Sequence, residues 1–227
     1  MFVLSDTQTR RCLALLVAFH ILVIAASNYL VQLPFTLFGF HTTWGAFSFP
    51  FIFLATDLTV RLFGKEPARA IVLRVMFPAL VISYVVSVVF PRGGFAGLEG
   101  LGEWNLFVAR IALASFMAYV LGQLLDVQVF DRLRALKVWW VAPAVSTVVG
   151  NLADTFAFFS IAFHASPDVF MAANWPEIAW VDYVIKLGIS LAFFLPLYGV
   201  LLGWLSRRLV DVTGSADLLP EKARARV

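Results

Sequence analysis

Residues 139–163 read WWVAPAVSTVVGNLADTFAFFSIAF, and this stretch decides the class of fold. It is long enough to cross the hydrocarbon core of a bilayer as an α-helix, which takes about 20 apolar residues. Its one charged residue is Asp154. The whole chain has the same character, since 61% of its 227 residues are hydrophobic and 14% are charged. Soluble domains have about 25% charged residues, so the composition indicates a membrane protein.

Five other segments of the chain have the same apolar character. Short polar or turn-forming stretches separate them, and no stretch has the composition of a separate soluble domain. The sequence therefore predicts an all-α, polytopic membrane protein with one transmembrane domain over residues 1–227 and a disordered polar tail over residues 213–227. The six predicted transmembrane helices cover residues 12–33, 45–63, 70–90, 105–125, 139–163 and 179–205.

The distribution of Lys and Arg predicts how the helices are oriented. If the N-terminus is cytoplasmic, 14 of the 17 basic residues lie in cytoplasmic segments and the external loops carry only Arg92. Such an excess of cytoplasmic positive charge is typical of inner-membrane proteins. Both termini are then cytoplasmic, which requires an even number of spans. The seven Trp residues fall near predicted span ends, where indole rings meet the lipid headgroups.

The sequence also argues against several classes of function. The pI of about 9.2 does not indicate direct nucleic-acid binding, because the basic residues sit in short clusters between apolar runs. The single cysteine, Cys12, excludes an intramolecular disulfide. No HExxH, Gly-x-Ser-x-Gly or Walker A motif is present, and no residues have metal-ligand spacing. We therefore predict a protein that is not an enzyme, with no catalytic residue, metal or cofactor.

Several charged side chains fall inside the predicted spans. A charge at the centre of a bilayer costs about 2.5–3.5 kcal/mol on insertion scales, so these groups are expected to face the interior of the bundle. Asp57 and Arg61 are four residues apart, and so are Asp182 and Lys186. This spacing places each pair on one face of a helix and predicts two ion pairs. Asp182 has a second interpretation, as a cap at the start of the sixth helix.

With this topology the polar side chains fall at two depths. The outer group contains Asn28, Arg110, Asp154 and Lys186, and the inner group contains Asp57, Arg61, Gln123 and Asp126. Two polar groups at different depths are consistent with a translocation path. They are equally consistent with polar contacts that only hold the helices together. Arg61 and Asp126 are explained better as residues at the cytoplasmic headgroup level. The deeper Asp57, Asp154 and Lys186 favour function, because ionisable groups inside membranes usually have one.

Long runs of this sequence resemble one family of bacterial transporters. The runs are FHTTWGAFSFPFIFLATDLTVRLFG from Phe40, NLFVARIALASFMAYVLGQLLDV from Asn105 and VDYVIKLGISLAFFLPLYGVLL from Val181. They are similar to the queuosine precursor transporters, also called the vitamin uptake transporter family, and the resemblance extends over about residues 7–210. It implies import of 7-cyano-7-deazaguanine, or of 7-aminomethyl-7-deazaguanine, across the inner membrane for queuosine modification of tRNA.

The resemblance also implies which residues matter. The family places Thr-Asp in the second helix, here Thr56 and Asp57, and Asp-Thr in the fifth helix, here Asp154 and Thr155. It places a Lys in the sixth helix, here Lys186. Many relatives have Glu four residues after the Asp of the second helix, where this chain has Arg61, so a coupling carboxylate is not carried over to that position.

These residues suggest a binding site for a flat base. A carboxylate accepts hydrogen bonds from N–H groups on a base edge, and we assign this role to Asp154, with Asn151 beside it. Lys186 or Arg110 would donate to the O6 atom or keep Asp154 ionised. The hypothesis is completed by Trp44 or Tyr183 as the stacking ring, and by Asp57, Thr56 and Arg61 as a proton-coupling site or inner gate.

Two other functions remain as alternatives. One is the substrate-binding component of an ATP-driven vitamin-type uptake complex, and the other is a non-catalytic membrane scaffold. The expected partners are the lipid bilayer and a small nucleobase-like substrate. A homodimer is left open, since small membrane bundles often dimerise but no span has a persuasive GxxxG stripe.

Overall fold

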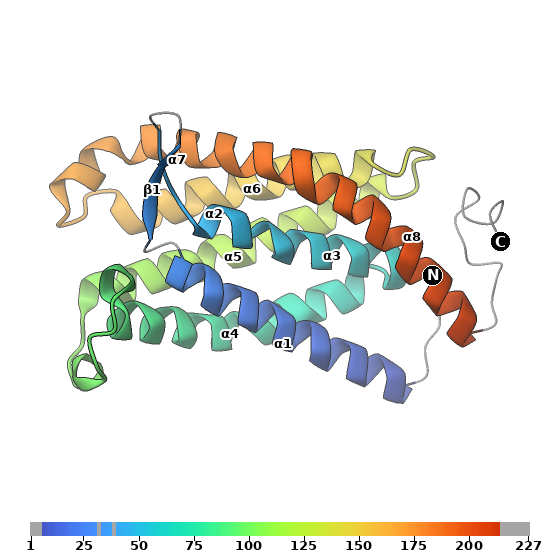
Figure 1. Ribbon diagram of the computed structural model, residues 1–227, viewed down its shortest axis with the longest axis horizontal. Helices are drawn as coiled ribbons and strands as arrows, with labels where there is room; N and C mark the ends of the chain where they lie inside the picture. Colours follow the sequence, from blue (N-terminus) through green and yellow to red (C-terminus); the bar gives the residue numbers. More distant parts are fainter. Residues whose placement is uncertain (1–5, 31–32, 38–39, 214–227) are drawn as a thin grey trace.

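The computed structural model describes residues 6–30, 33–37 and 40–213, and most of them belong to long helices that run side by side (Figure 1). The predicted tail falls almost wholly outside these residues. The helices are α1 (Asp6–Leu30), α2 (Gly45–Ser48), α3 (Pro50–Phe63), α4 (Lys65–Val89), α5 (Leu106–Leu133), α6 (Val141–Phe163), α7 (Val169–Ile189) and α8 (Leu195–Thr213). A π-helical turn, η3 (Ser190–Phe194), joins α7 to α8, and the 3-10 turns η1 (Pro91–Gly93) and η2 (Glu99–Gly102) follow α4.

The structure confirms an all-α, multi-pass membrane architecture. Within the described ranges, five helical segments are long and apolar enough to cross a membrane. They are Gly45–Phe63, Lys65–Val89, Leu106–Leu133, Val141–Phe163 and Val169–Arg207. Helix α1 is also 25 residues long and contains the shorter apolar section Leu13–Ser27. A sixth span through α1 remains a prediction, as do the bounds of all six.

Two local features differ from the sequence-based expectation. The connection before the second helical segment contains a small antiparallel hairpin, formed by β1 (Pro34–Leu37) and β2 (Phe40–Thr43). The last helical segment begins at Val169, ten residues before the predicted start of the sixth span. Asp168 caps this helix, because its side chain accepts a hydrogen bond from the Met171 amide at 3.0 Å. Asp182 therefore lies inside α7, and the interpretation of Asp182 as a cap was wrong.

Two glycines allow α5 and α6 to pack closely against each other. A Cβ atom on Gly122 of α5 would lie 2.8 Å from the Cβ of Asp154 on α6. A Cβ atom on Gly150 of α6 would lie 3.0 Å from the Cβ of Asp126 on α5 and 2.8 Å from the Phe53 ring. The two distances of 2.8 Å are shorter than real Cβ contacts, so a side chain at either position would force its neighbours to shift. The same helix crossing therefore positions both aspartates.

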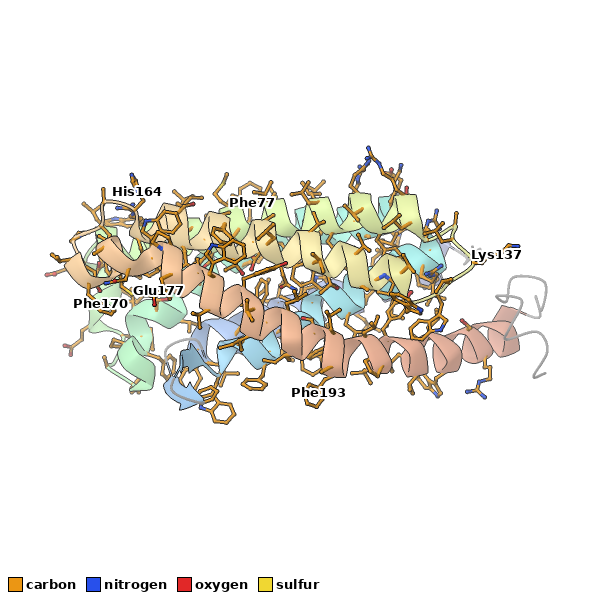
Figure 2. All side chains as sticks on the ribbon, turned by 90° about the horizontal axis from the view of Figure 1, so that it is seen from above. Phe77, Lys137, His164, Phe170, Glu177 and Phe193 are labelled. Atoms are coloured by element: carbon orange, nitrogen blue, oxygen red, sulfur yellow. The ribbon has the colours of Figure 1, made fainter. Side chains whose placement is uncertain are left out.

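The ends of the bundle differ in charge. In Figure 1 the start of α1 and the end of α8 lie at the same end, together with the α3–α4 and α5–α6 connections. Figure 2 labels Lys137 at this end and His164 at the opposite end. The first end also carries an ion-pair group in which Asp131 contacts Lys65 at 3.2 Å and Arg134 at 2.7 Å. This basic end is the one that the sequence predicts to be cytoplasmic.

The outer surface of the bundle is apolar. Phe77 of α4 and Phe193 of η3 are 63% and 68% exposed and point outward on different sides (Figure 2). Inside, an apolar cluster around Ile52, Val72 and Val75 packs α1, α3, α4 and α5 together. A second cluster around Phe130 and Tyr198 joins α3, α5, α6 and α8. Polar side chains are thus buried within a bundle whose exterior suits lipid.

Candidate functional site

A cavity of about 130 Å³ lies in the bundle toward the end opposite the basic residues. We call it the outer cavity. Its walls come from α1, α2, α4, α5, α6 and α7. Its charged lining residues are Asp154, Asp182 and Lys186, and its aromatic ones are Phe49, Phe116, Tyr119, Phe158 and Phe159. The cavity therefore combines ionic groups with flat apolar walls, as small-molecule sites commonly do.

The charged group in the outer cavity contains one cation between two carboxylates. The Nζ atom of Lys186 lies 2.7 Å from Oδ2 of Asp182 and 3.8 Å from Oδ2 of Asp154. The side chains are 13% exposed for Lys186, 17% for Asp182 and 6% for Asp154. The predicted Asp182–Lys186 ion pair is confirmed, and Asp154 joins it from α6. One carboxylate is left in excess, which makes the group a strong hydrogen-bond acceptor for a ligand.

The predicted stacking residues lie elsewhere. Trp44 is half exposed and stacks on Phe35 of β1, with ring centroids 4.7 Å apart. Tyr183 is buried on α7, where its hydroxyl donates to the Val148 carbonyl oxygen at 3.4 Å. Neither is among the residues that line the outer cavity. The rings that do line it include Phe49, whose face lies 5.5 Å from the Lys186 Nζ atom.

Arg110 also lies outside the outer cavity. Its guanidinium donates to the carbonyl oxygen of Ile161 at 2.7 Å, and to those of His164 and Ala165. These carbonyls end α6, and a helix end leaves its last carbonyls without partners inside the helix. Arg110 thus ties the start of α5 to the end of α6.

A second, smaller cavity of about 20 Å³ lies nearer the basic end, and we call it the inner cavity. Asp57 of α3 is its one charged lining residue, and Thr147, Ser190 and Tyr198 add hydroxyls from α6, η3 and α8. The Asp57 carboxylate accepts a hydrogen bond from the Ser146 hydroxyl at 3.3 Å. Asp126 of α5 lies beside both. This volume holds about one water molecule and excludes a base.

The predicted ion pair between Asp57 and Arg61 is not formed. The Arg61 guanidinium instead donates to the Tyr198 hydroxyl at 3.1 Å, and to the carbonyl oxygens of Arg134 at 2.6 Å and Trp139 at 3.1 Å. These contacts draw the cation toward the loop between α5 and α6, away from its i, i+4 partner. Arg61 therefore links α3 to α8 and to the α5–α6 loop at the basic end of the bundle.

A polar stripe on α6 joins the two cavities. Thr147 lines the inner cavity, Asp154 lines the outer one, and Asn151 lies between them along the helix. Asn151 is fully buried, and neither its amide oxygen nor its amide nitrogen has a hydrogen-bond partner in the described structure. Buried amides are nearly always paired, so this one is available to a ligand or to water. On α3, the Thr56 hydroxyl donates to the Gln123 amide oxygen at 2.6 Å.

Sequence reasoning missed the position of Asp126. The predicted fourth span ended at residue 125, so Asp126 was also explained as a headgroup-level residue. Helix α5 continues to Leu133, and Asp126 is fully buried. The ion-pair group of Asp131 and Arg134, one turn or more beyond, marks the true end of the buried section. Among the described residues, no group of three His, Cys, Asp or Glu side chains could hold a metal ion.

Comparison with known proteins gives the chain its family. Residues 43–201 match the family model described as "Putative vitamin uptake transporter". The chain is 63% identical over 211 residues to the queuosine precursor transporter of Escherichia coli, covering 93% of this chain and 96% of that protein. It is 55% identical over 219 residues to a "Probable queuosine precursor transporter" of Haemophilus influenzae, covering 91% of this chain and 93% of that protein.

A more distant relative shares the same description. The chain is 30% identical over 172 residues to a "Probable queuosine precursor transporter" of Bacillus subtilis, with 73% of this chain and 74% of that protein covered. No solved structure matches the chain. These relatives are transporters and not enzymes, which agrees with the absence of catalytic motifs. The family match and the relatives together show that the chain belongs to the vitamin uptake transporter family.

Proposed function

We propose that this protein imports a queuosine precursor of the 7-deazaguanine class across the inner membrane. The printed names of its relatives support the substrate class. The observation that carries the proposal is the outer cavity, in which Asp154, Asp182 and Lys186 meet aromatic walls. The preferred substrate is 7-cyano-7-deazaguanine, and 7-aminomethyl-7-deazaguanine is the second candidate.

The chemistry of the base suits the outer cavity. A 7-deazaguanine has N–H donors at N1 and N2, an acceptor at O6 and two flat faces. The Asp154 carboxylate would accept the N–H groups, and the Lys186 ammonium would donate to O6. Phe49 and Phe158 supply apolar faces on which the base would stack. Asp182 holds Lys186 in place at 2.7 Å and keeps the group charged.

The route inward follows the polar stripe of α6. The unpaired amide of Asn151, which lies between the two cavities along α6, would meet the base after it leaves Asp154. Asp57 and Thr56 lie on the inner side of Asn151 and belong to the gate. Arg61 supports the gate as a brace, and Arg110, Trp44 and Tyr183 support the walls without contacting the base.

The orientation of the import path follows from the charged end of the bundle. The end at which α4 begins and α5 ends, where Figure 2 labels Lys137, is cytoplasmic in this proposal, which puts both termini inside and the outer cavity toward the exterior. We propose no direct contact with nucleic acid.

The test is transport by the purified chain in liposomes. We expect uptake of radiolabelled 7-cyano-7-deazaguanine without any ATPase partner, and this result would exclude the ATP-driven alternative. Asp154→Asn and Lys186→Ala each remove a charged hydrogen-bond partner, which is worth about 1.5–3 kcal/mol, so uptake at low substrate should fall about tenfold to a hundredfold.

Two matched controls remove the same charges at the surface. Glu66→Gln and Lys137→Ala alter exposed side chains that do not line either cavity, and they should transport like the wild type. Wild-type uptake by both Asp154→Asn and Lys186→Ala would contradict the site assignment. A wild-type chain that binds the base but transports it only with an ATPase would favour the alternative.

A further inference from the structure

A pair of buried carboxyls beside the inner cavity takes no part in binding the base. Asp57 of α3 is 2% exposed and Asp126 of α5 is fully buried, and they lie beside each other. The Ser146 hydroxyl of α6 bonds to Asp57 and also lies against Asp126. Neither oxygen of Asp126 accepts a hydrogen bond from any donor in the described structure.

In the part of the chain that the structure describes, this pair has no cation in ion-pair contact. Arg61 is the nearest basic side chain on α3, and its guanidinium is occupied by Tyr198 and two backbone carbonyls. Within the described residues, neither Asp57 nor Asp126 takes part in an ion pair. Two adjacent carboxylates in a medium of low dielectric constant do not both ionise, so the pair retains a proton.

The surroundings of the pair supply no other charge. Apolar residues of α3 and α5, Leu58 and Val127, directly follow the two aspartates along their helices and belong to the apolar cluster around Phe130 and Tyr198. From α5 the amide of Gln123 bonds to Thr56, and from α8 the titratable Tyr198 bonds to Arg61. The π-helical turn adds Ser190, whose buried hydroxyl has no partner in the described structure. Hydroxyls and an amide thus face the pair, with Arg61 as the one charged neighbour.

The pair borders a water-sized cavity and is linked through α5 and α6 to the outer cavity. Asp57 lines the inner cavity, which has room for about one water molecule. Asp126 packs against Gly150 of α6, while Asp154 packs against Gly122 of α5. A shift of α5 against α6 would therefore move the carboxyl pair and the outer cavity together.

We propose that the Asp57–Asp126 pair carries one proton inward with each molecule of substrate, so that import is driven by the proton gradient. This inference rests on the proposed function. On the outer side, one carboxylate oxygen of the pair forms an O–H bond to a proton given up by hydronium, which becomes water, and that hydroxyl donates a hydrogen bond to the other carboxylate. On the inner side, the O–H bond breaks and the proton passes to water in the inner cavity. One positive charge crosses the membrane with each neutral base.

The first experiment uses the wild-type protein in liposomes that contain a pH-sensitive dye. Adding 7-cyano-7-deazaguanine outside should acidify the interior, and the reversal potential should give a ratio of one proton to one substrate. Exchange of labelled for unlabelled substrate should also occur without a pH gradient. Exchange without acidification would overturn the proton proposal while leaving the proposed function intact. Absence of exchange would overturn both.

The second experiment tests whether proton movement depends on Asp57 and Asp126 themselves. Asp57→Asn and Asp126→Asn should each lower substrate-driven acidification at least tenfold more than they lower exchange. Glu66→Gln removes an exposed carboxylate at the start of α4 and should behave like the wild type in both assays. Equal losses of acidification and exchange, or full acidification in both Asn variants, would overturn the assignment to this pair. If a variant does not fold, the wild-type ratio of one proton to one substrate still decides whether transport is proton-coupled.

Discussion

The outer and inner cavities both bury carboxylates, but they differ in size and in how their charge is neutralised. In the outer cavity, Lys186 stands between Asp154 and Asp182, and about 130 Å³ is open beside them. In the inner cavity, Asp57 has Asp126 as its neighbour and only about 20 Å³ is open. A cation among carboxylates presents donors and acceptors to a molecule, whereas two carboxyls without a cation hold a proton. The difference indicates that the outer cavity binds the substrate and the inner carboxyl pair binds the driving proton.

The largest effect is expected from removing the cation of the outer cavity. Lys186→Ala leaves Asp154 and Asp182 buried together, and breaking a buried ion pair costs about 3–5 kcal/mol of stability. We expect a clear fall in the thermal unfolding midpoint together with the loss of uptake. The double variant Lys186→Ala/Asp182→Asn should recover the midpoint but not the uptake. An unchanged unfolding midpoint in Lys186→Ala would show that water reaches these three charged side chains more freely than their burial implies.

The glycines at the α5–α6 crossing allow each cavity to be altered separately. In Gly122→Ala the new methyl group would press on Asp154, and in Gly150→Ala it would press on Asp126 and Phe53. Overpacking of this kind costs about 1–3 kcal/mol. We expect Gly122→Ala mainly to weaken substrate binding, by about tenfold, and Gly150→Ala mainly to reduce proton movement.

Gly188→Ala is the matched control for this pair of variants, since a Cβ atom there meets nothing within 4 Å. It should bind and transport like the wild type. If Gly122→Ala and Gly150→Ala gave the same profile in binding and proton assays, the two cavities would have to be regarded as one functional unit.

A smaller effect on binding should show whether the base stacks on a ring that lines the outer cavity or on the ring predicted from the sequence. Phe158 lines the outer cavity and Trp44 does not. Replacing an aromatic ring that stacks on a base costs about 1–3 kcal/mol, so Phe158→Leu should weaken binding about fivefold or more. Trp44→Leu should have a smaller effect, and Phe77→Leu on the lipid-facing surface should have none. A larger loss in Trp44→Leu would restore the sequence-based hypothesis.

The smallest effect on binding is expected at Arg110. Its guanidinium holds the last carbonyls of α6 and does not face the outer cavity. Arg110→Gln should therefore lower the unfolding midpoint, because those carbonyls lose charged hydrogen bonds worth about 1.5–3 kcal/mol each. The dissociation constant for the base should change by less than about twofold. A tenfold weaker constant with an unchanged midpoint would return Arg110 to the binding site.

Much of the fold could be predicted from the sequence, because the apolar composition and the length of the segments determine it. The Asp182–Lys186 pair was also predictable, since both residues lie on one helix and four-residue spacing fixes their proximity. The Asp57–Arg61 pair has the same spacing and is not formed, because Arg61 finds the carbonyls of Arg134 and Trp139 in a distant part of the chain. Spacing shows which partners are available but not which of them is chosen.

The composition of each cavity could not be predicted for a related reason. Asp126 and Asp57 are 69 residues apart on α5 and α3, and both helices pack closely against α6 at Gly150, where a Cβ atom would meet Asp126 and Phe53. The predicted end of the fourth span also depended on hydropathy, which falls at Asp126 although the helix continues to Leu133. The rings around the outer cavity were hidden among 23 Phe residues, because composition does not distinguish a ring that faces a cavity from one that faces lipid.

The central claim, that the outer cavity binds a 7-deazaguanine through Asp154, is tested most directly by equilibrium binding to the purified protein. The account predicts saturable binding of 7-cyano-7-deazaguanine by the wild type, and binding at least tenfold weaker in Asp154→Asn. An analogue methylated at N1 loses a donor to the same carboxylate, so the wild type should bind it at least tenfold more weakly as well. Equal affinity of the wild type and Asp154→Asn for the unmodified base would contradict the account.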